Sequence, residues 1–76
     1  MSEEEIRMLL LMSGFNLRQG LKNTYEYKSN TQIRVVVRIK KVEVTVNNYK
    51  NFTRYEYSEF QAALTHALGE CNGNIS

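Results

Sequence analysis

The sequence contains no proline and no tryptophan, and it has a single cysteine and a single histidine. Because Cys71 has no second cysteine to pair with, no disulfide can form within the chain, which favours a reducing compartment. The longest apolar run spans Met8 to Met12 and is far too short to cross a bilayer. The first residues are acidic, unlike those of a signal peptide. We therefore expect a cytoplasmic protein that makes no membrane contact.

The side chains that most catalytic and metal sites need are also scarce. A zinc site uses about four ligands, whereas His66 and Cys71 are the only histidine and cysteine. We expect residues 70–76 to form a flexible C-terminal tail, in which Cys71 could not hold the geometry of a Cys–His nucleophile. The glycines are isolated, so no glycine-rich phosphate loop is present. The sequence therefore predicts no enzyme activity, no metal and no cofactor.

What the chain does contain is a dense β-branched stretch, residues 33–46, with the sequence IRVVVRIKKVEVTV. Apolar and polar residues alternate along it, which is typical of a strand, and the phase of the alternation changes after Ile39. A two-residue turn at Lys40-Lys41 explains the change, because Ile39 then lies opposite Val42 and the valines share one face. Lysines suit such a turn poorly, so a β-bulge in one long bent strand stays open as the alternative.

The segments on either side of residues 33–46 predict the other elements. Ser2 and Glu5 form a capping box before an apolar stretch, and glycine is a typical residue after a helix end, as at Gly14. We expect a helix over residues 3–13, a strand over 21–28, a strand over 52–57 whose full length stays open, and a helix from Ser58 to Gly69. This order predicts an α+β fold: a helix, an antiparallel meander of three or four strands, and a helix, in one compact domain over residues 1–69. Both helices should lie on one face of the sheet, against the alternating valines.

Positive charge is concentrated in the middle of the chain, where residues 16–57 carry nine lysines and arginines against three glutamates. The predicted register places Glu26 opposite Arg34 and Arg38 opposite Glu43, on the sheet face that the helices leave open. Such a mixed row of charges can bind a partner. The residues that we expect at this partner-binding site are Arg34, Val36, Arg38, Lys40, Lys41 and Glu43.

The first helix provides an alternative apolar contact. Arg7 is the only charged residue between Glu5 and Ser13, so the helix is apolar on more than one side. One interpretation is a core helix with a few exposed methionines. The other is a surface for a partner or a second copy of the chain, which would make the protein a monomer or a homodimer through the first helix. The residues of this alternative contact are Met8, Leu11 and Met12.

Two functions fit these observations. The first is a small protein-interaction module, an inhibitor or adaptor that docks on a larger protein. Short single-domain chains of this size and composition are frequent among phage and mobile-element accessory proteins, including inhibitors of host defence systems. If a phage encodes the chain, its location would be the host cytoplasm.

The second is a nucleic-acid-binding domain that uses the basic face of the sheet. The helix–meander–helix order resembles that of the double-stranded-RNA-binding domain, which would imply binding to RNA. The resemblance is limited to the order of the elements, because that family has a lysine-rich start of its second helix and this chain has Ser58-Glu59-Phe60-Gln61 there. Proteins that stack single-stranded bases on a sheet need aromatic residues on its open face, and the predicted register places the tyrosines on the covered face.

Overall fold

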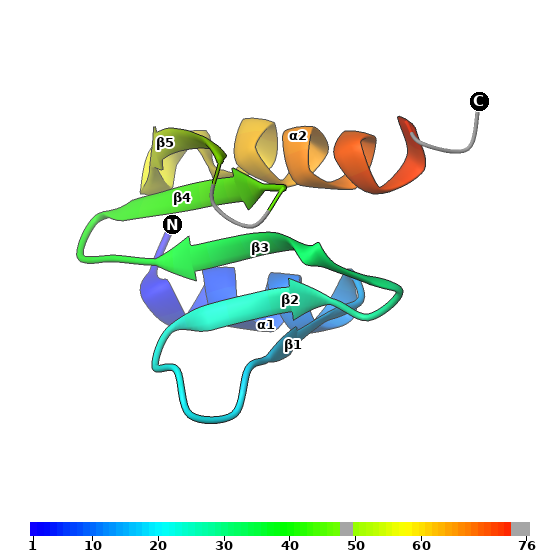
Figure 1. Ribbon diagram of the computed structural model, residues 1–76. Helices are drawn as coiled ribbons and strands as arrows, with labels where there is room; N and C mark the ends of the chain where they lie inside the picture. Colours follow the sequence, from blue (N-terminus) through cyan, green and yellow to red (C-terminus); the bar gives the residue numbers. More distant parts are fainter. Residues whose placement is uncertain (48–49, 74–76) are drawn as a thin grey trace.

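Five strands form a single antiparallel sheet, preceded by one helix and followed by another (Figure 1). The computed structural model describes residues 1–47 and 50–73 of the chain. The strands neighbour one another in sequence order, β1-β2-β3-β4-β5. The elements are α1 (Glu3–Met12), β1 (Phe15–Leu17), β2 (Thr24–Tyr27), β3 (Asn30–Val37), β4 (Lys41–Val46), β5 (Asn51–Glu56), a 3₁₀ turn (Tyr57–Glu59) and α2 (Phe60–Gly73).

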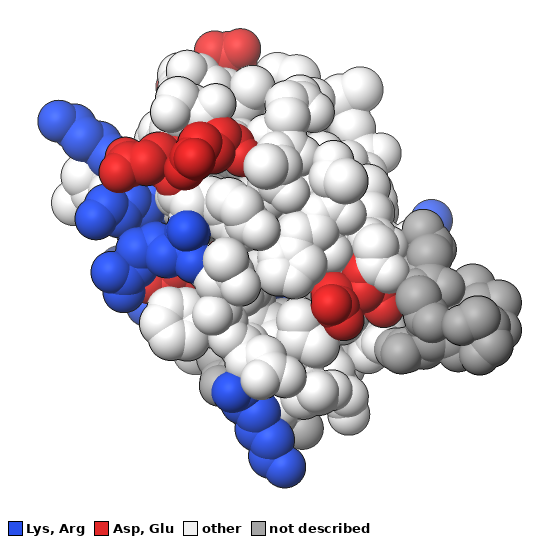
Figure 2. Space-filling view, turned by 90° about the horizontal axis from the view of Figure 1, so that it is seen from above, with Lys and Arg blue, Asp and Glu red and all other residues white. Residues whose placement is uncertain are grey.

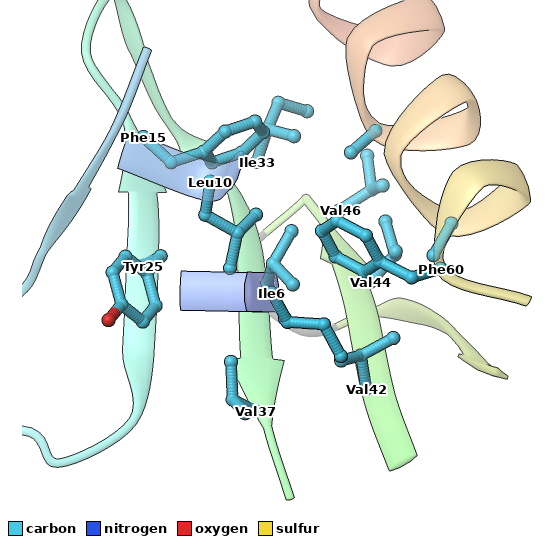
Figure 3. Close-up of a cluster of buried hydrophobic side chains, with 13 residues drawn as sticks. Ile6, Leu10, Phe15, Tyr25, Ile33, Val37, Val42, Val44, Val46 and Phe60 are labelled. Carbon is cyan, nitrogen blue, oxygen red and sulfur yellow. The ribbon is translucent and has the colours of Figure 1, made fainter. Parts of the chain in front are cut away.

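Both helices lie on the same face of the sheet and share one core with it. Ile6 and Leu10 come from α1, while Phe60 reaches from α2 toward Val44 and Val46 (Figure 3). Removing these side chains from water is the main source of stability in a domain of this size. The predicted α+β fold, with a helix, an antiparallel meander and a helix on one face, is confirmed. The sheet has five strands rather than three or four, because the three-residue strand β1 is too short to show an alternating pattern.

The β3–β4 hairpin exists, but its turn lies one residue earlier than Lys40-Lys41. Val37 lies opposite Val42, and the N–H of Arg38 donates to the carbonyl of Lys41 at 2.7 Å, so Ile39 and Lys40 form the turn. Every residue pair of this hairpin therefore differs from the predicted one by two residues. A shift of two preserves the face of each side chain, so the valines still face the helices. Ile39, predicted to lie opposite Val42, is instead 87% exposed.

The β2–β3 hairpin has the predicted pairing of Glu26 with Arg34. Its first strand is shorter than predicted and begins at Thr24, because residues 18–23 form a loop. The register between the strands shifts after Glu26, so Tyr27 lies opposite Asn30. On its other side, Tyr27 pairs with Phe15 of β1, and their rings make an edge-to-face contact with centroids 5.2 Å apart. The contact helps to hold the short edge strand β1 against the sheet.

The start of α1 has the predicted capping box. The N–H of Glu5 donates to the hydroxyl of Ser2 at 3.2 Å, and the N–H of Ser2 donates to the carboxylate of Glu5 at 3.2 Å. Gly14 follows the helix with φ of +100°, a conformation that favours glycine.

The second α-helix starts later than predicted, at Phe60 rather than at Ser58, because Tyr57–Glu59 form a 3₁₀ turn. Ahead of this turn, the N–H of Glu56 donates to the carboxylate of Glu59 at 3.2 Å. The helix also continues past Gly69 to Gly73. Gly69 does not end it, because Cys71 in the next turn still packs on the core. Of the predicted tail, residues 74–76 lie outside the described residues.

The position of the β3–β4 turn can be tested with two matched substitutions. Lys40 has φ of +62°, a conformation that costs a non-glycine residue about 1–2 kcal/mol, whereas glycine at Lys41, inside β4, costs about 0.5–1 kcal/mol. Both changes affect the denatured chain alike. Lys40→Gly should therefore be more stable than Lys41→Gly by about 1–2 kcal/mol in urea unfolding. Equal stabilities would contradict a turn at Ile39-Lys40.

Candidate functional site: the open face of the sheet

The face of the sheet opposite α1 and α2 carries most of the charged residues of the strands, and we call it the outer face. Strand pairing aligns its side chains in rows that run across the strands. One row joins Thr24, Val36, Glu43 and Arg54 across β2, β3, β4 and β5. The next row joins Glu26, Arg34, Thr45 and Phe52.

Two glutamates on the outer face each lie between two arginines. Glu26 binds Arg18 and, through Oε2, the Nε of Arg34 at 3.0 Å. We call these three residues the first cluster. This cluster has a net charge of +1, because one carboxylate faces two guanidinium groups.

The second cluster is formed by Glu43 with Arg38 and Arg54. The Nε of Arg38 lies 3.4 Å from Oε1 of Glu43, and the Nε of Arg54 lies 3.3 Å from Oε2. Glu43 therefore uses one oxygen for each arginine. Arg38 reaches it diagonally, because Val36 is the residue directly opposite Glu43.

The two clusters differ in how far water reaches them. The glutamates of both clusters are 15% exposed, but the arginines differ: Arg18 and Arg34 are 42% and 13% exposed, whereas Arg38 and Arg54 are 62% and 54% exposed. The largely buried pair of Arg34 and Glu26 is held by the surrounding protein, whereas exposed arginines stay accessible to another molecule. The first cluster therefore belongs mainly to the fold, and the second presents its arginines to solvent.

A shallow hollow of about 180 Å³ lies beside the second cluster. Its lining includes Val36, Thr45 and Phe52 together with Arg38 and Glu43. Val36 and Thr45 are buried although they lie on the outer face. Phe52 is 57% exposed. The hollow thus combines an apolar floor with charged walls, which is the usual make-up of a site that accepts one side chain of a partner.

The structure places most of the predicted site residues together. Arg34, Val36, Arg38 and Glu43 lie on the outer face, and Lys41 lies at its end, opposite Glu56 of β5. Lys40 lies in the turn with a positive φ, so it does not continue the line of Arg34 and Arg38 along β3.

Sequence reasoning missed the parts that β1 and β5 contribute to this face. Arg54 and Phe52 come from β5, and their guanidinium carbon and ring centroid lie 5.9 Å apart. Arg18, which follows β1, completes the first cluster. The alternation of β5 could have placed Arg54 on this face, but only the register could show that it shares Glu43 with Arg38.

The alternative apolar contact is also exposed. Met8, Leu11 and Met12 are 57%, 55% and 75% exposed, while Ile6 and Leu10 on the same helix are fully buried. α1 thus has one face in the core and an apolar face in solvent.

A further group of titratable side chains lies between β5 and α2. The hydroxyl of Tyr55 lies 2.9 Å from Nδ1 of His66, and Nε2 of His66 lies 3.8 Å from Glu70. His66 and Glu70 line a hollow of about 510 Å³ between α2 and the first residues of β5. Burial raises the pKa of the Cys71 thiol, which lowers its thiolate fraction and its reactivity.

Comparisons with protein-family models, with curated proteins and with solved structures find no match to this chain. Across residues 1–47 and 50–73, no group of three or more His, Cys, Asp or Glu side chains could hold a metal ion. In the same part of the chain, no helix is long and apolar enough to span a membrane. The outer face is therefore described by its own geometry alone.

The two clusters should differ in their contribution to stability. Glu26→Gln weakens contacts of the half-buried Arg34 and should lower the free energy of unfolding by about 1–2 kcal/mol. Glu43→Gln weakens contacts to two exposed arginines and should cost less than about 1 kcal/mol. Urea unfolding of the two variants, each with the same isosteric change, measures the difference. A larger loss for Glu43→Gln would contradict the structural role of the first cluster.

Proposed function

We propose that this protein is a small non-enzymatic interaction module, an inhibitor or adaptor, that docks its outer face on a larger protein. The observation that supports the proposal is the geometry of the second cluster. Arg38 and Arg54 both contact Glu43 through Nε. Within the described residues, their terminal Nη atoms have no hydrogen-bond partner. Two exposed guanidinium groups thus remain free to bind another molecule.

The chemistry of these groups favours carboxylates on the partner. The paired Nη atoms of a guanidinium group match the two oxygens of a carboxylate, a geometry that lysine cannot copy. The hollow beside Arg38 has room for an apolar side chain over Val36 and Phe52. An acidic surface with one protruding apolar residue would therefore fit this face. Binding there would block or bridge the partner without any chemical step, as an inhibitor or adaptor does.

Size and composition support the more specific proposal of a phage or mobile-element accessory protein. Such a protein would act in the cytoplasm, that of the host if a phage encodes it, by occupying a surface of a defence protein.

Nucleic-acid binding is the second candidate, and one observation favours it. Phe52 is an exposed aromatic residue on the outer face, next to Arg54, and this pair could stack on a base. Two observations oppose it. Glu26 and Glu43 neutralise part of the positive charge of the face, and Tyr25 is buried on the covered face, where it cannot stack on a base.

Paired substitutions of the second cluster test the proposed function. The double variant Arg38→Glu/Arg54→Glu should lose its protein partner in an affinity purification from nuclease-treated lysate of the source cells, because both guanidinium groups are reversed in charge. The variant Lys22→Glu/Lys28→Glu is the matched control, since both lysines are exposed loop residues and the change in net charge is the same. This control should retain the partner. Retention by both variants would exclude the outer face, and Leu11→Gln/Met12→Gln would then test α1.

Conservative variants separate the two candidate functions. Arg38→Lys/Arg54→Lys keeps the charge and removes the bidentate geometry, so it should weaken a protein complex by about tenfold or more. Its affinity for short labelled RNA or DNA, measured by fluorescence anisotropy, should be nearly unchanged. A nucleic-acid complex that weakens steeply with salt, without any recovered protein partner, would favour the second candidate.

A further inference from the structure

β5 is an open edge of the sheet, and it is long and regular. The other edge strand, β1, has only three residues, whereas β5 has six and pairs with β4 without any shift in register. Residues 51–54 are exposed, both those on the outer face and those on the helix face. Figure 2 shows the molecule from above, the side on which α2 and β5 lie in Figure 1, and acidic and basic side chains adjoin at its left. Natural sheets usually protect such an edge with a bulge, a proline or a covering element.

The main-chain groups that β5 leaves without a strand partner can be identified from the register. The N–H of Tyr57 donates to the carbonyl of Lys40 on the β4 side, at 3.2 Å. Successive residues of a strand point their N–H and C=O groups to opposite sides, so Phe52, Arg54 and Glu56 point away from β4. The N–H of Glu56 agrees, because it donates to the carboxylate of Glu59. The groups of Phe52 and Arg54 remain for an added strand.

We infer that this edge pairs with β5 of a second copy of the chain, in antiparallel orientation about a two-fold axis at Thr53. In this register Phe52 of each copy lies opposite Arg54 of the other. The arrangement extends a contact that exists within one chain, where the guanidinium carbon of Arg54 lies 5.9 Å from the centroid of the Phe52 ring. Lys50 and Glu56, just beyond these pairs, meet at each end with opposite charges.

Charge excludes the two neighbouring registers. An axis at Arg54 would place two arginines directly opposite each other, and an axis at Phe52 would place Arg54 opposite Lys50 of the second copy. Like charges directly opposite each other destabilise a strand pair. The axis at Thr53 is the one of the three that avoids them.

Charge complementarity also favours this edge over the apolar face of α1 as the contact between copies. The first turn of α1 has three glutamates and its last turn has no basic residue. Two antiparallel copies of α1 would therefore gain no ion pairs. The β5 pair gains main-chain hydrogen bonds and opposite charges together, and it makes the outer faces of the two copies continuous.

Variants that place a positive or a negative charge at Thr53 test both the dimer and its register. Thr53 should face Thr53 of the second copy, so Thr53→Lys and Thr53→Glu each place like charges together and should weaken the dimer by about tenfold or more. An equal mixture of the two variants should restore it as a heterodimer. Sedimentation equilibrium over a dilution series measures the mass. Thr65→Lys and Thr65→Glu, at an exposed threonine of α2, are the matched controls and should dimerise as the parent chain does.

Hydrogen exchange gives an independent measurement on the parent chain. The amides of Phe52 and Arg54 should exchange more slowly as concentration rises. The amide of Leu17, which points away from the sheet at the β1 edge, should not change, because the N–H of Arg18 is the one that donates to Thr24. A monomer at all concentrations would overturn the inference. So would a dimer that persists in Thr53→Lys, which would place the contact elsewhere, for example on α1.

The contact between two β5 strands and the proposed function can be tested independently of each other. The side chain of Thr53 lies on the helix face of the sheet, opposite the side chains of Arg38 and Arg54. Thr53→Lys should therefore break the dimer and leave the arginines of the outer face in place. Loss of the dimer with retention of the protein partner would support both.

Discussion

The packing of alternate valines from β3 and β4 against both helices is the contact on which the rest of the structure depends. The side chains of Val37, Val42 and Val44 project from the sheet and pack in one core with those of α1 and α2. A domain of 76 residues buries a smaller share of its surface than a larger domain does. It therefore cannot lose this contact and keep the helices in place. The hairpin holds the two helices together, although they are at opposite ends of the chain.

The same alternation creates the outer face. Each valine that points to the helices is followed by a residue that points away from them, so the arginines and glutamates of β3 and β4 come together on the other side. The long side chains of arginine then cover apolar atoms with their methylene groups while their charged ends reach water. This arrangement explains why Val36 is only 7% exposed although no helix lies on its face.

The sequence predicts faces more reliably than registers. The period of two in residues 33–46 was enough to assign the valines and the arginines to their faces, because a shift of two residues leaves those faces unchanged. The position of the turn depended on one residue, Lys40, whose positive φ is unusual for lysine and could not be expected from its type. The sharing of Glu43 by Arg38 and Arg54 depends on strands that are distant in sequence, so no local pattern could show it.

The sequential order of the strands has a consequence for how the chain folds. Each strand pairs with the strand next to it in sequence, so every hairpin closes a short loop and no pairing must wait for a distant segment. Proteins rich in such local contacts fold faster than those with crossed connections. The absence of proline removes the slow isomerisation step that limits many folding reactions. The chain should therefore fold quickly and without a proline-limited slow phase.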